Sequence, residues 1–223
     1  LTHRIKDDRM PLSPVQHQGK VLNLLGVHVD DERLELWPSP EDERCIEEFL
    51  KSQWLAENQQ LIGINMSASK RWKTKNWPLR HIAKLCEVLG KEHKRVVITG
   101  TDVDKDYMRR LMDLLKESKP IDACGKTTIN QLASLIKKCA VYISPDSAAL
   151  HIAAAMGTPF IALFGPTHAQ RHLPPAREFV VIHKGVPCSP CYKTDCSKLK
   201  CMEQITPEEV KEAIDTLLKK KEA

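Results

Sequence analysis

The sequence predicts a doubly wound α/β domain with a parallel sheet, and three observations lead to this fold class. Short, nearly continuous apolar segments alternate along the chain with longer segments whose apolar residues recur at helical spacing. Glycines and helix-capping residues separate the two kinds of segment. The composition, 42% hydrophobic and 28% charged among 223 residues, is ordinary for a globular protein. Short apolar strands of this kind are typical of a parallel sheet covered by helices on both faces.

The expected elements follow from these signals in chain order. We expect strands at residues 61–65, 95–99, 121–124, 141–144, 159–164 and 179–182. Helices are expected at 79–89, 104–115, 128–138 and 147–156, with a final helix beginning at 206. Thr128 and Gln131 have the spacing of a capping box, and Gly157 is placed to end the helix before it. Ligands of such a sheet bind outside the carboxyl ends of the strands, so the loops there are the candidate sites.

The first 40 residues differ from the rest. They carry four prolines around a single short apolar run and therefore predict an irregular connecting arm. Ser39 and Pro40 then have the pattern of a helix start, and Ile46, Phe49, Leu50 and Trp54 are spaced as its apolar face. The chain begins with Leu, and its first residues lack the apolar segment that is typical of a signal peptide. We expect a fragment or a degenerate N-terminus.

Charge and composition exclude several classes of partner. The net charge is only +5, and the aromatic residues, 5% of the chain, are not interleaved with basic ones, so we expect no nucleic-acid binding. No apolar run approaches the 18 residues of a membrane span. Phosphorylated small molecules or an anionic membrane surface are the expected acidic partners.

The eight cysteines form two groups. Cys45, Cys86, Cys124 and Cys139 lie in apolar or helical sequence and are expected to be small buried hydrophobic residues. The other four are close together in the sequence, at Cys188, Cys191, Cys196 and Cys201. They could form a tetrahedral zinc site, remain free thiols, or pair as disulfides. Disulfides are uncommon in the cytosol, where a chain without a secretory signal is expected to be.

Two loops at the carboxyl edge carry the chemistry. The segment from Asp146 joins a strand to a helix through small residues, so the helix's unpaired first-turn amides could bind an anion. His151 lies about one turn further along that helix. The loop after the strand at 61–65 reads MSASKRWKTKNWP at 66–78, a cationic loop suited to a diphosphate. Helix capping and a solvated basic loop are the alternatives.

Several motifs resemble one family. The segment DSAALHIAAAMGTP at 146–159, with IALFGPT at 161–167, resembles the signature of the ADP-heptose:lipopolysaccharide heptosyltransferases, glycosyltransferase family 9. The runs KNWP at 75–78 and CSPC at 188–191 match as well. The resemblance covers roughly residues 15–220. It implies the GT-B architecture of two Rossmann-like domains. Residues 1–40 would be the arm from a missing or truncated N-terminal domain, and 41–223 the C-terminal, nucleotide-sugar-binding domain.

The resemblance also implies roles for residues. Lys75 would contact the donor diphosphate and stabilise it as the leaving group. The donor-binding set would be Ser67, Ser69, Asp104, Thr127, Asp146, Ser147, Ala148 and His151. Many members have Thr-Gly after the motif aspartate, whereas this chain has Ser147 and Ala148. The family's proposed general base lies in the N-terminal domain, so we expect this chain alone to bind donor but to transfer sugar poorly.

The implied function is transfer of heptose from ADP-heptose to the lipopolysaccharide inner core by an inverting enzyme, with lipid A-core as acceptor. No cofactor is required; Asp102 and Asp104 match a DxD metal motif only by chance. The expected location is the cytoplasm, with peripheral contact at the inner face of the inner membrane as a further option. Two alternatives to this function remain open. The chain could belong to a GT-B transferase that uses another nucleotide sugar, or it could be a nucleotide-sugar-binding module without catalysis.

Overall fold

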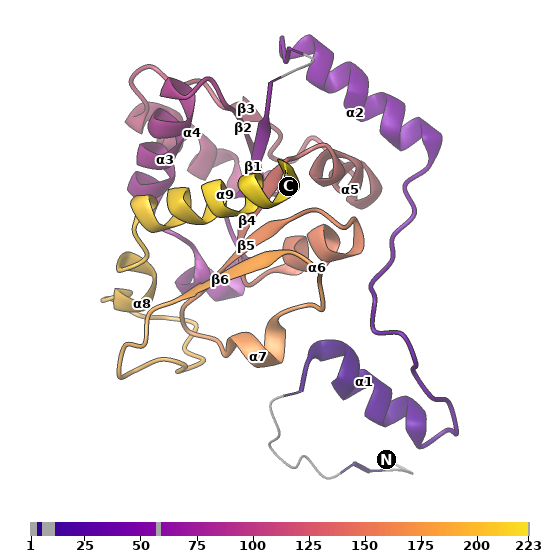
Figure 1. The fold of residues 1–223 in the computed structure, drawn as a ribbon. Helices are drawn as coiled ribbons and strands as arrows, with labels where there is room; N and C mark the ends of the chain where they lie inside the picture. The colour runs from indigo at the N-terminus through magenta and orange to yellow at the C-terminus, as the bar shows by residue number, and fades with distance from the viewer. Residues whose placement is uncertain (1–3, 6–11, 57–58, 223) are drawn as a thin grey trace.

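The computed structural model describes residues 4–5, 12–56 and 59–222, and it confirms the doubly wound α/β fold. Its six strands form one parallel sheet in the order β3-β2-β1-β4-β5-β6 (Figure 1). They are β1 (Leu61–Asn65), β2 (Arg95–Thr99), β3 (Ile121–Asp122), β4 (Val141–Pro145), β5 (Phe160–Phe164) and β6 (Phe179–His183).

The strand order reverses between β1 and β4, and in open α/β sheets the position outside the carboxyl ends of two such strands is called the crevice. The chain leaves β1 toward β2 and β3, then returns to place β4 on the other side of β1, with Ile62 beside Val141 and Ile64 beside Ile143. The connections after β1 and β4 therefore run to opposite sides. This is the topological switch point at which open α/β sheets bind ligands.

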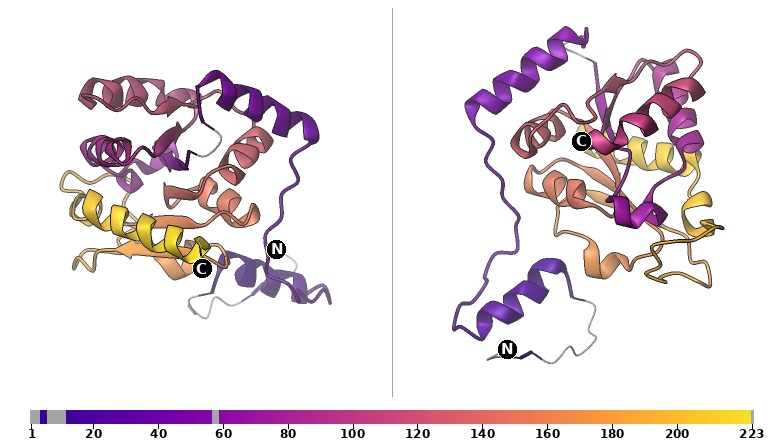
Figure 2. Two further views of the ribbon diagram at one scale, coloured as in Figure 1. Left: turned by 45° about the horizontal axis from the view of Figure 1, so that its top comes forward. Right: turned by 180° about the vertical axis from the view of Figure 1, so that it is seen from behind.

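Helices cover both faces of the sheet (Figures 1 and 2). On one face α3 (Leu79–Lys91) packs against α4 (Lys105–Leu114) and α9 (Pro207–Glu222). On the other face α5 (Ile129–Lys137) packs against α2 (Pro40–Ser52) and α6 (Ala148–Ala155). Four short helical segments lie in the connections: η1 (Lys70–Lys75), η2 (Asp102–Asp104), α7 (Ala169–His172) and α8 (Lys200–Glu203).

Packing inside the sheet explains the glycine in the middle of β1. A Cβ on Gly63 would lie 2.4 Å from Cδ2 of Tyr142, the neighbouring residue on β4. That distance is shorter than any van der Waals contact, so the ring of Tyr142 occupies the space that a side chain at 63 would need. The aromatic residue and the glycine therefore form one packing unit at the centre of the sheet.

The arm was predicted incorrectly in one part. Residues Pro14–Asn23 form α1, which begins with a capping box between Ser13 and Gln16. Gly19 is the single buried residue of this helix, so packing contributes little to its stability. The local capping signal is therefore the main reason that the helix forms here. Positions 1–3 and 6–11 of the arm lie outside the described residues. The division into 1–40 and 41–223 stays a prediction.

Two further expectations about side chains were wrong. The capping box of α2 forms between Ser39 and Asp42, but the helix ends at Ser52. Trp54 lies beyond that end with a φ of 57° and is 92% exposed, so it is not part of the apolar face. Cys45 is also exposed, because its neighbour Ile46 is the residue of this turn that is buried in the core.

The strand expected at 121–124 ends after Asp122, whose Oδ1 accepts a hydrogen bond from the backbone N–H of Cys124 at 2.9 Å. Likewise η2 replaces the start of the helix expected at 104, so that α4 begins at Lys105. Within the part of the chain that the structure describes, no helix is both long enough and apolar enough to cross a bilayer.

Candidate functional site

The candidate site lies at the carboxyl ends of β1 and β4. Ser147 is the N-cap of α6, and its Oγ accepts from the backbone N–H of Ala149 at 3.2 Å. The helix therefore begins at the crevice, with the positive end of its dipole toward any bound anion. Ala148, the first residue of the helix, is exposed.

Asn65 connects the two sides of the crevice. Its Nδ2 lies 2.8 Å from the carbonyl oxygen of Ser67 and 3.0 Å from the hydroxyl oxygens of both Ser144 and Ser147. The side chain thus ties the end of β1 to the start of α6. The sequence interpretation missed this residue, although a polar residue ending an apolar strand at a sheet's carboxyl edge was the available signal.

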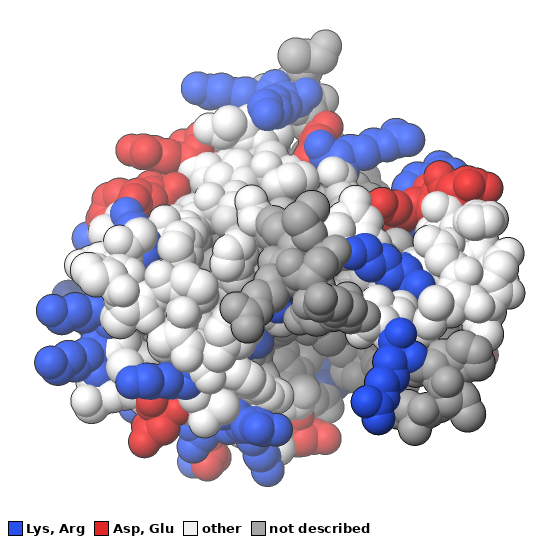
Figure 3. Space-filling model, turned by 90° about the horizontal axis from the view of Figure 1, so that it is seen from below, with Lys and Arg blue, Asp and Glu red and all other residues white. Residues whose placement is uncertain are grey.

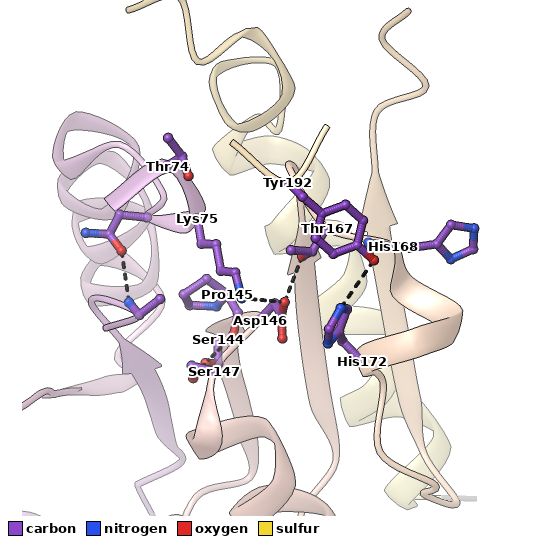
Figure 4. Close-up of polar contacts among 12 residues, drawn as sticks. Thr74, Lys75, Ser144, Pro145, Asp146, Ser147, Thr167, His168, His172 and Tyr192 are labelled. Carbon is purple, nitrogen blue, oxygen red and sulfur yellow. Dashed lines mark hydrogen bonds and ion pairs between the residues drawn. The ribbon is translucent and has the colours of Figure 1, made fainter. Parts of the chain in front are cut away.

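Lys75 and Asp146 meet at the centre of the site (Figure 4). The Nζ of Lys75 lies 2.8 Å from Oδ2 of Asp146, and their side chains are only 12% and 8% exposed. The same Oδ2 accepts from Oγ1 of Thr167 at 2.7 Å. Lys75 also lies over the ring of Trp72, 4.6 Å from its centroid. The sequence interpretation placed Lys75 and Asp146 in separate loops and gave Thr167 no role.

Asp104 forms a second buried contact at the edge of the site. Its Oδ1 accepts from Oγ of Ser67 at 2.7 Å, while its Oδ2 accepts from the N–H and the hydroxyl of Thr101 at 2.7 and 2.8 Å. Ser67 and Asp104, which are 37 positions apart in the sequence, are therefore neighbours. Both oxygens of Asp104 already accept hydrogen bonds, so a ligand hydroxyl would have to share them.

Besides His151, three of the predicted residues take no part in these contacts. Ser69 is the exposed N-cap of η1 and makes no side-chain cap bond. Thr127 is half-buried just before Thr128, the N-cap of α5. Ala148 has no polar side-chain atom, so only its backbone could form a hydrogen bond. All three lie in segments that follow the carboxyl ends of strands, and the structure brings none of them into hydrogen-bond contact with Lys75 or Asp146.

Unpaired positive charge lies on one side of the site. Lys70, Arg71 and Lys73 lie on η1 with Lys75, and these three exposed cations form no ion pair within the described residues. Figure 3 shows the face that lies at the bottom of Figure 1, on which Lys and Arg side chains are scattered together with some Asp and Glu. Exposed cations beside a site raise the local concentration of anionic ligands.

Two histidines, His151 and His172, interact electrostatically with Asp146, and Figure 4 shows His172 across Asp146 from Lys75. Burial lowers the pKa of His151, and the negative charge of Asp146 opposes that shift. Burial also lowers the pKa of His172, again against the effect of Asp146. Tyr192 fixes this side, because its hydroxyl lies 3.3 Å from Nε2 of His172 and 3.3 Å from the backbone nitrogen of His168. Near neutral pH both His151 and His172 are uncharged and can donate or accept hydrogen bonds.

The structure does not support the zinc-site alternative for Cys188, Cys191, Cys196 and Cys201. Within the described ranges, no three His, Cys, Asp or Glu side chains lie close enough together to bind a metal ion. Cys201 is buried in α8, where it packs in the core below Gly165, whereas Cys188 is exposed. All eight cysteines are free thiols, so none of the four forms a disulfide.

The segment that carries these cysteines is instead hydrogen-bonded to the backbone on two sides of the site. The N–H groups of Cys191 and Tyr192 both donate to the carbonyl of Pro166, at 3.0 and 2.8 Å. On the other side, Oγ1 of the buried Thr74 donates to the carbonyl of Lys193 at 2.7 Å. The segment therefore fixes the backbone next to Thr167 and the backbone next to Lys75.

Comparisons with known proteins show the family to which the chain is related. The family model of glycosyltransferase family 9 (heptosyltransferase) matches residues 22–202. A lipooligosaccharide heptosyltransferase 2 from Campylobacter jejuni is 29% identical over 170 residues, which are 74% of this chain and 53% of the relative. The chain thus spans about half the length of the curated relatives it matches.

Two solved structures have the same fold. The glycosyl transferase family 9 protein from Veillonella parvula superposes with a TM-score of 0.77 at 26% identity, over 90% of this chain and 58% of that one. The ADP-heptose lipopolysaccharide heptosyltransferase II from Escherichia coli gives a TM-score of 0.71 at 25% identity, over 85% and 54%. With a family match over most of its length and a fold shared with these structures, the chain belongs to glycosyltransferase family 9, the heptosyltransferase family.

Proposed function

We propose that this chain is the donor-binding part of a heptosyltransferase that transfers heptose from ADP-heptose to the inner core of lipopolysaccharide. The observation that carries the proposal is the pairing of Lys75 with Asp146 beside the start of α6, at the switch point of the sheet. Membership of the family and the name of the Escherichia coli structure support this donor.

In this proposal the diphosphate of the donor lies between η1 and α6. Lys75 and the first amides of α6 meet the negative charge that develops on the nucleoside diphosphate as it leaves. Ser67 and Ser69 line the phosphate side, and Ser147 and Ala148 provide the close approach at the helix start. A site that stabilises the leaving group with an ammonium and amides needs no metal ion for that step.

The remaining residues are assigned to the two ends of the donor. Asp104 would bind the ribose and Thr127 would lie on the adenine side, since both follow strands on the β2–β3 side of the sheet. Asp146 and His151 would contact the sugar. The lowered pKa of His151 keeps its imidazole ring neutral. A ring nitrogen can therefore accept a hydrogen bond from a sugar hydroxyl without adding positive charge.

The acceptor side belongs to the proposal as well. Inverting transfer needs a general base that deprotonates the acceptor hydroxyl as it attacks. We assign that base and the lipid A-core acceptor site to an N-terminal domain preceding residues 1–40. This chain alone would then bind ADP-heptose but transfer heptose poorly. The proposed location is the cytoplasm, with contact at the inner face of the inner membrane.

Calorimetric titration tests the donor site. We expect the chain to bind ADP and ADP-heptose more tightly than GDP or UDP, and Lys75→Ala to weaken ADP binding by about tenfold or more, because a charge-assisted contact contributes roughly 1.5–3 kcal/mol. Lys84→Ala is the matched control, since Lys84 is an exposed lysine of α3 paired with Glu208. Tighter binding of GDP or UDP would assign a different donor. Weak binding of every nucleotide, unchanged by Lys75→Ala, would refute the proposal.

A further inference from the structure

Thr167 shares its hydrogen-bond acceptor with Lys75. Its Oγ1 donates to Oδ2 of Asp146 at 2.7 Å, and the Nζ of Lys75 lies 2.8 Å from the same oxygen (Figure 4). Thr167 is only 1% exposed. Oδ1 of Asp146 receives no hydrogen bond from the described residues. One carboxylate oxygen is thus held by two side chains, and the other remains available to a ligand.

This sharing matters when a diphosphate enters. A phosphate oxygen would compete with Asp146 for the ammonium group of Lys75. If Lys75 turned to the diphosphate and Asp146 had no second donor, an almost fully buried carboxylate would lose its partner, which is strongly unfavourable. Thr167 remains bonded to Oδ2 after Lys75 leaves. It therefore lowers the free-energy cost of moving Lys75 from the carboxylate to the ligand.

We propose that Thr167 is a positioning residue for donor binding, an inference that rests on the proposed function. It holds the Asp146 carboxylate in one orientation, with Oδ1 free for the donor, while Lys75 exchanges Asp146 for the diphosphate. Thr167 touches Asp146 and acts through it.

The backbone around Thr167 is fixed well enough for this role. The carbonyl of Pro166 accepts two hydrogen bonds, from the N–H groups of Cys191 and Tyr192. The carbonyl of Gly165 accepts from the hydroxyl of Ser189. Thr167 therefore follows two residues that are anchored to a different segment of the chain, so its hydroxyl stays in place when Lys75 moves.

Isosteric substitutions test the role of the hydroxyl. Thr167→Val removes it and keeps the volume, whereas Thr167→Ser keeps it and removes the methyl group. Thr158→Val is the matched control, because Thr158 is also buried and its Oγ1 donates to the carbonyl of Ile136 at 3.1 Å, away from the site. We expect Thr167→Val to weaken ADP binding about tenfold by calorimetry, Thr167→Ser to bind within about threefold of the original chain, and Thr158→Val to leave the affinity unchanged.

A double-mutant cycle in urea unfolding gives a readout without ligand. Thr167→Val and Lys75→Met together remove both donors of Oδ2, so their combined loss of stability should exceed the sum of the single losses. Thr158→Val and Lys75→Met should be additive.

The outcomes separate this inference from the proposed function. If the original chain binds ADP and Thr167→Val binds it equally well, the inference is wrong and the donor site stands. An equal loss in Thr167→Ser and Thr167→Val would assign the effect to the methyl group and also overturn it, as would additive losses in the Thr167 cycle. If the original chain binds no nucleotide, the proposed function fails and this inference fails with it.

Discussion

Replacing Asn65 with leucine should destabilise the protein more than the loss of one ordinary hydrogen bond. The side chain is buried at 8% exposure, and its Nδ2 is shared among the Ser67 carbonyl and the hydroxyls of Ser144 and Ser147. Leucine has a similar volume but offers no donor. The two serine hydroxyls still contact each other at 2.9 Å, whereas the Ser67 carbonyl loses its partner.

The expected magnitude follows from counting these groups. The hydrogen bond to the serine hydroxyls contributes about 1 kcal/mol, and the buried carbonyl of Ser67 left without a donor costs about 1–3 kcal/mol. We therefore expect Asn65→Leu to lower the free energy of unfolding by about 3 kcal/mol. For a chain of this length that corresponds to a fall in Tm of roughly 6–12 °C.

Urea unfolding measured by circular dichroism provides the assay. Asn76→Leu is the control, because Asn76 is half-buried on the same loop and its Oδ1 accepts one hydrogen bond, from the backbone N–H of Ala68 at 2.9 Å. We expect this control to lose about 1 kcal/mol. Equal losses for the two variants, at unchanged slope, would refute the view that Asn65 holds the two sides of the crevice together.

Two further predictions concern protonation. Burial lowers the pKa of His151 and His172 in the folded state, so the unfolded chain binds more protons than the folded one below about pH 6.5, and stability should fall as the pH drops through that region. His172→Gln should make the fall shallower, by at most about 1.4 kcal/mol per pH unit; an unchanged slope of unfolding free energy against pH would contradict this. Labelling with a thiol reagent at pH 8 should modify Cys196 rapidly, because backbone N–H groups of Leu199 and Lys198 lower the pKa of its thiol. The buried thiols of Cys86, whose pKa is raised to about 12, and of Cys124 and Cys139 should react only after unfolding, and mass spectrometry showing native labelling there would be inconsistent with the packing.

Local signals were sufficient to predict most of the fold. The caps at Ser39 and Thr128 were identified from the sequence, because a helix start is set by a side chain and amides within three residues of it. The same signal at Ser13 was overlooked because of the surrounding prolines, and α1 was missed. The prediction for Trp54 was wrong for a different reason. Trp54 has the right spacing for the apolar face, but the helix ends at Ser52, before this residue is reached.

The candidate site was only partly predictable. The prediction that the residues after β1 and β4 would lie at one edge was confirmed, because parallel strands place their carboxyl ends together. The contacts within the site were not predictable in this way. Asn65 bonds to residues 79 and 82 positions away, and Thr167 to one 21 positions away, so these pairs depend on which strands are neighbours.

The sequence by itself determined the alternation of strands and helices, the helix starts and the basic loop, because these depend on periodicity and on hydrogen bonds between near neighbours. Only the tertiary structure decided that Lys75 pairs with Asp146, that Thr167 shares its oxygen, and that the cysteines of the described residues do not form a group able to hold a metal ion. Each of these is a contact between segments that the sheet order brings together. The distance between two such side chains is set by the packing of the whole sheet and not by their spacing along the chain.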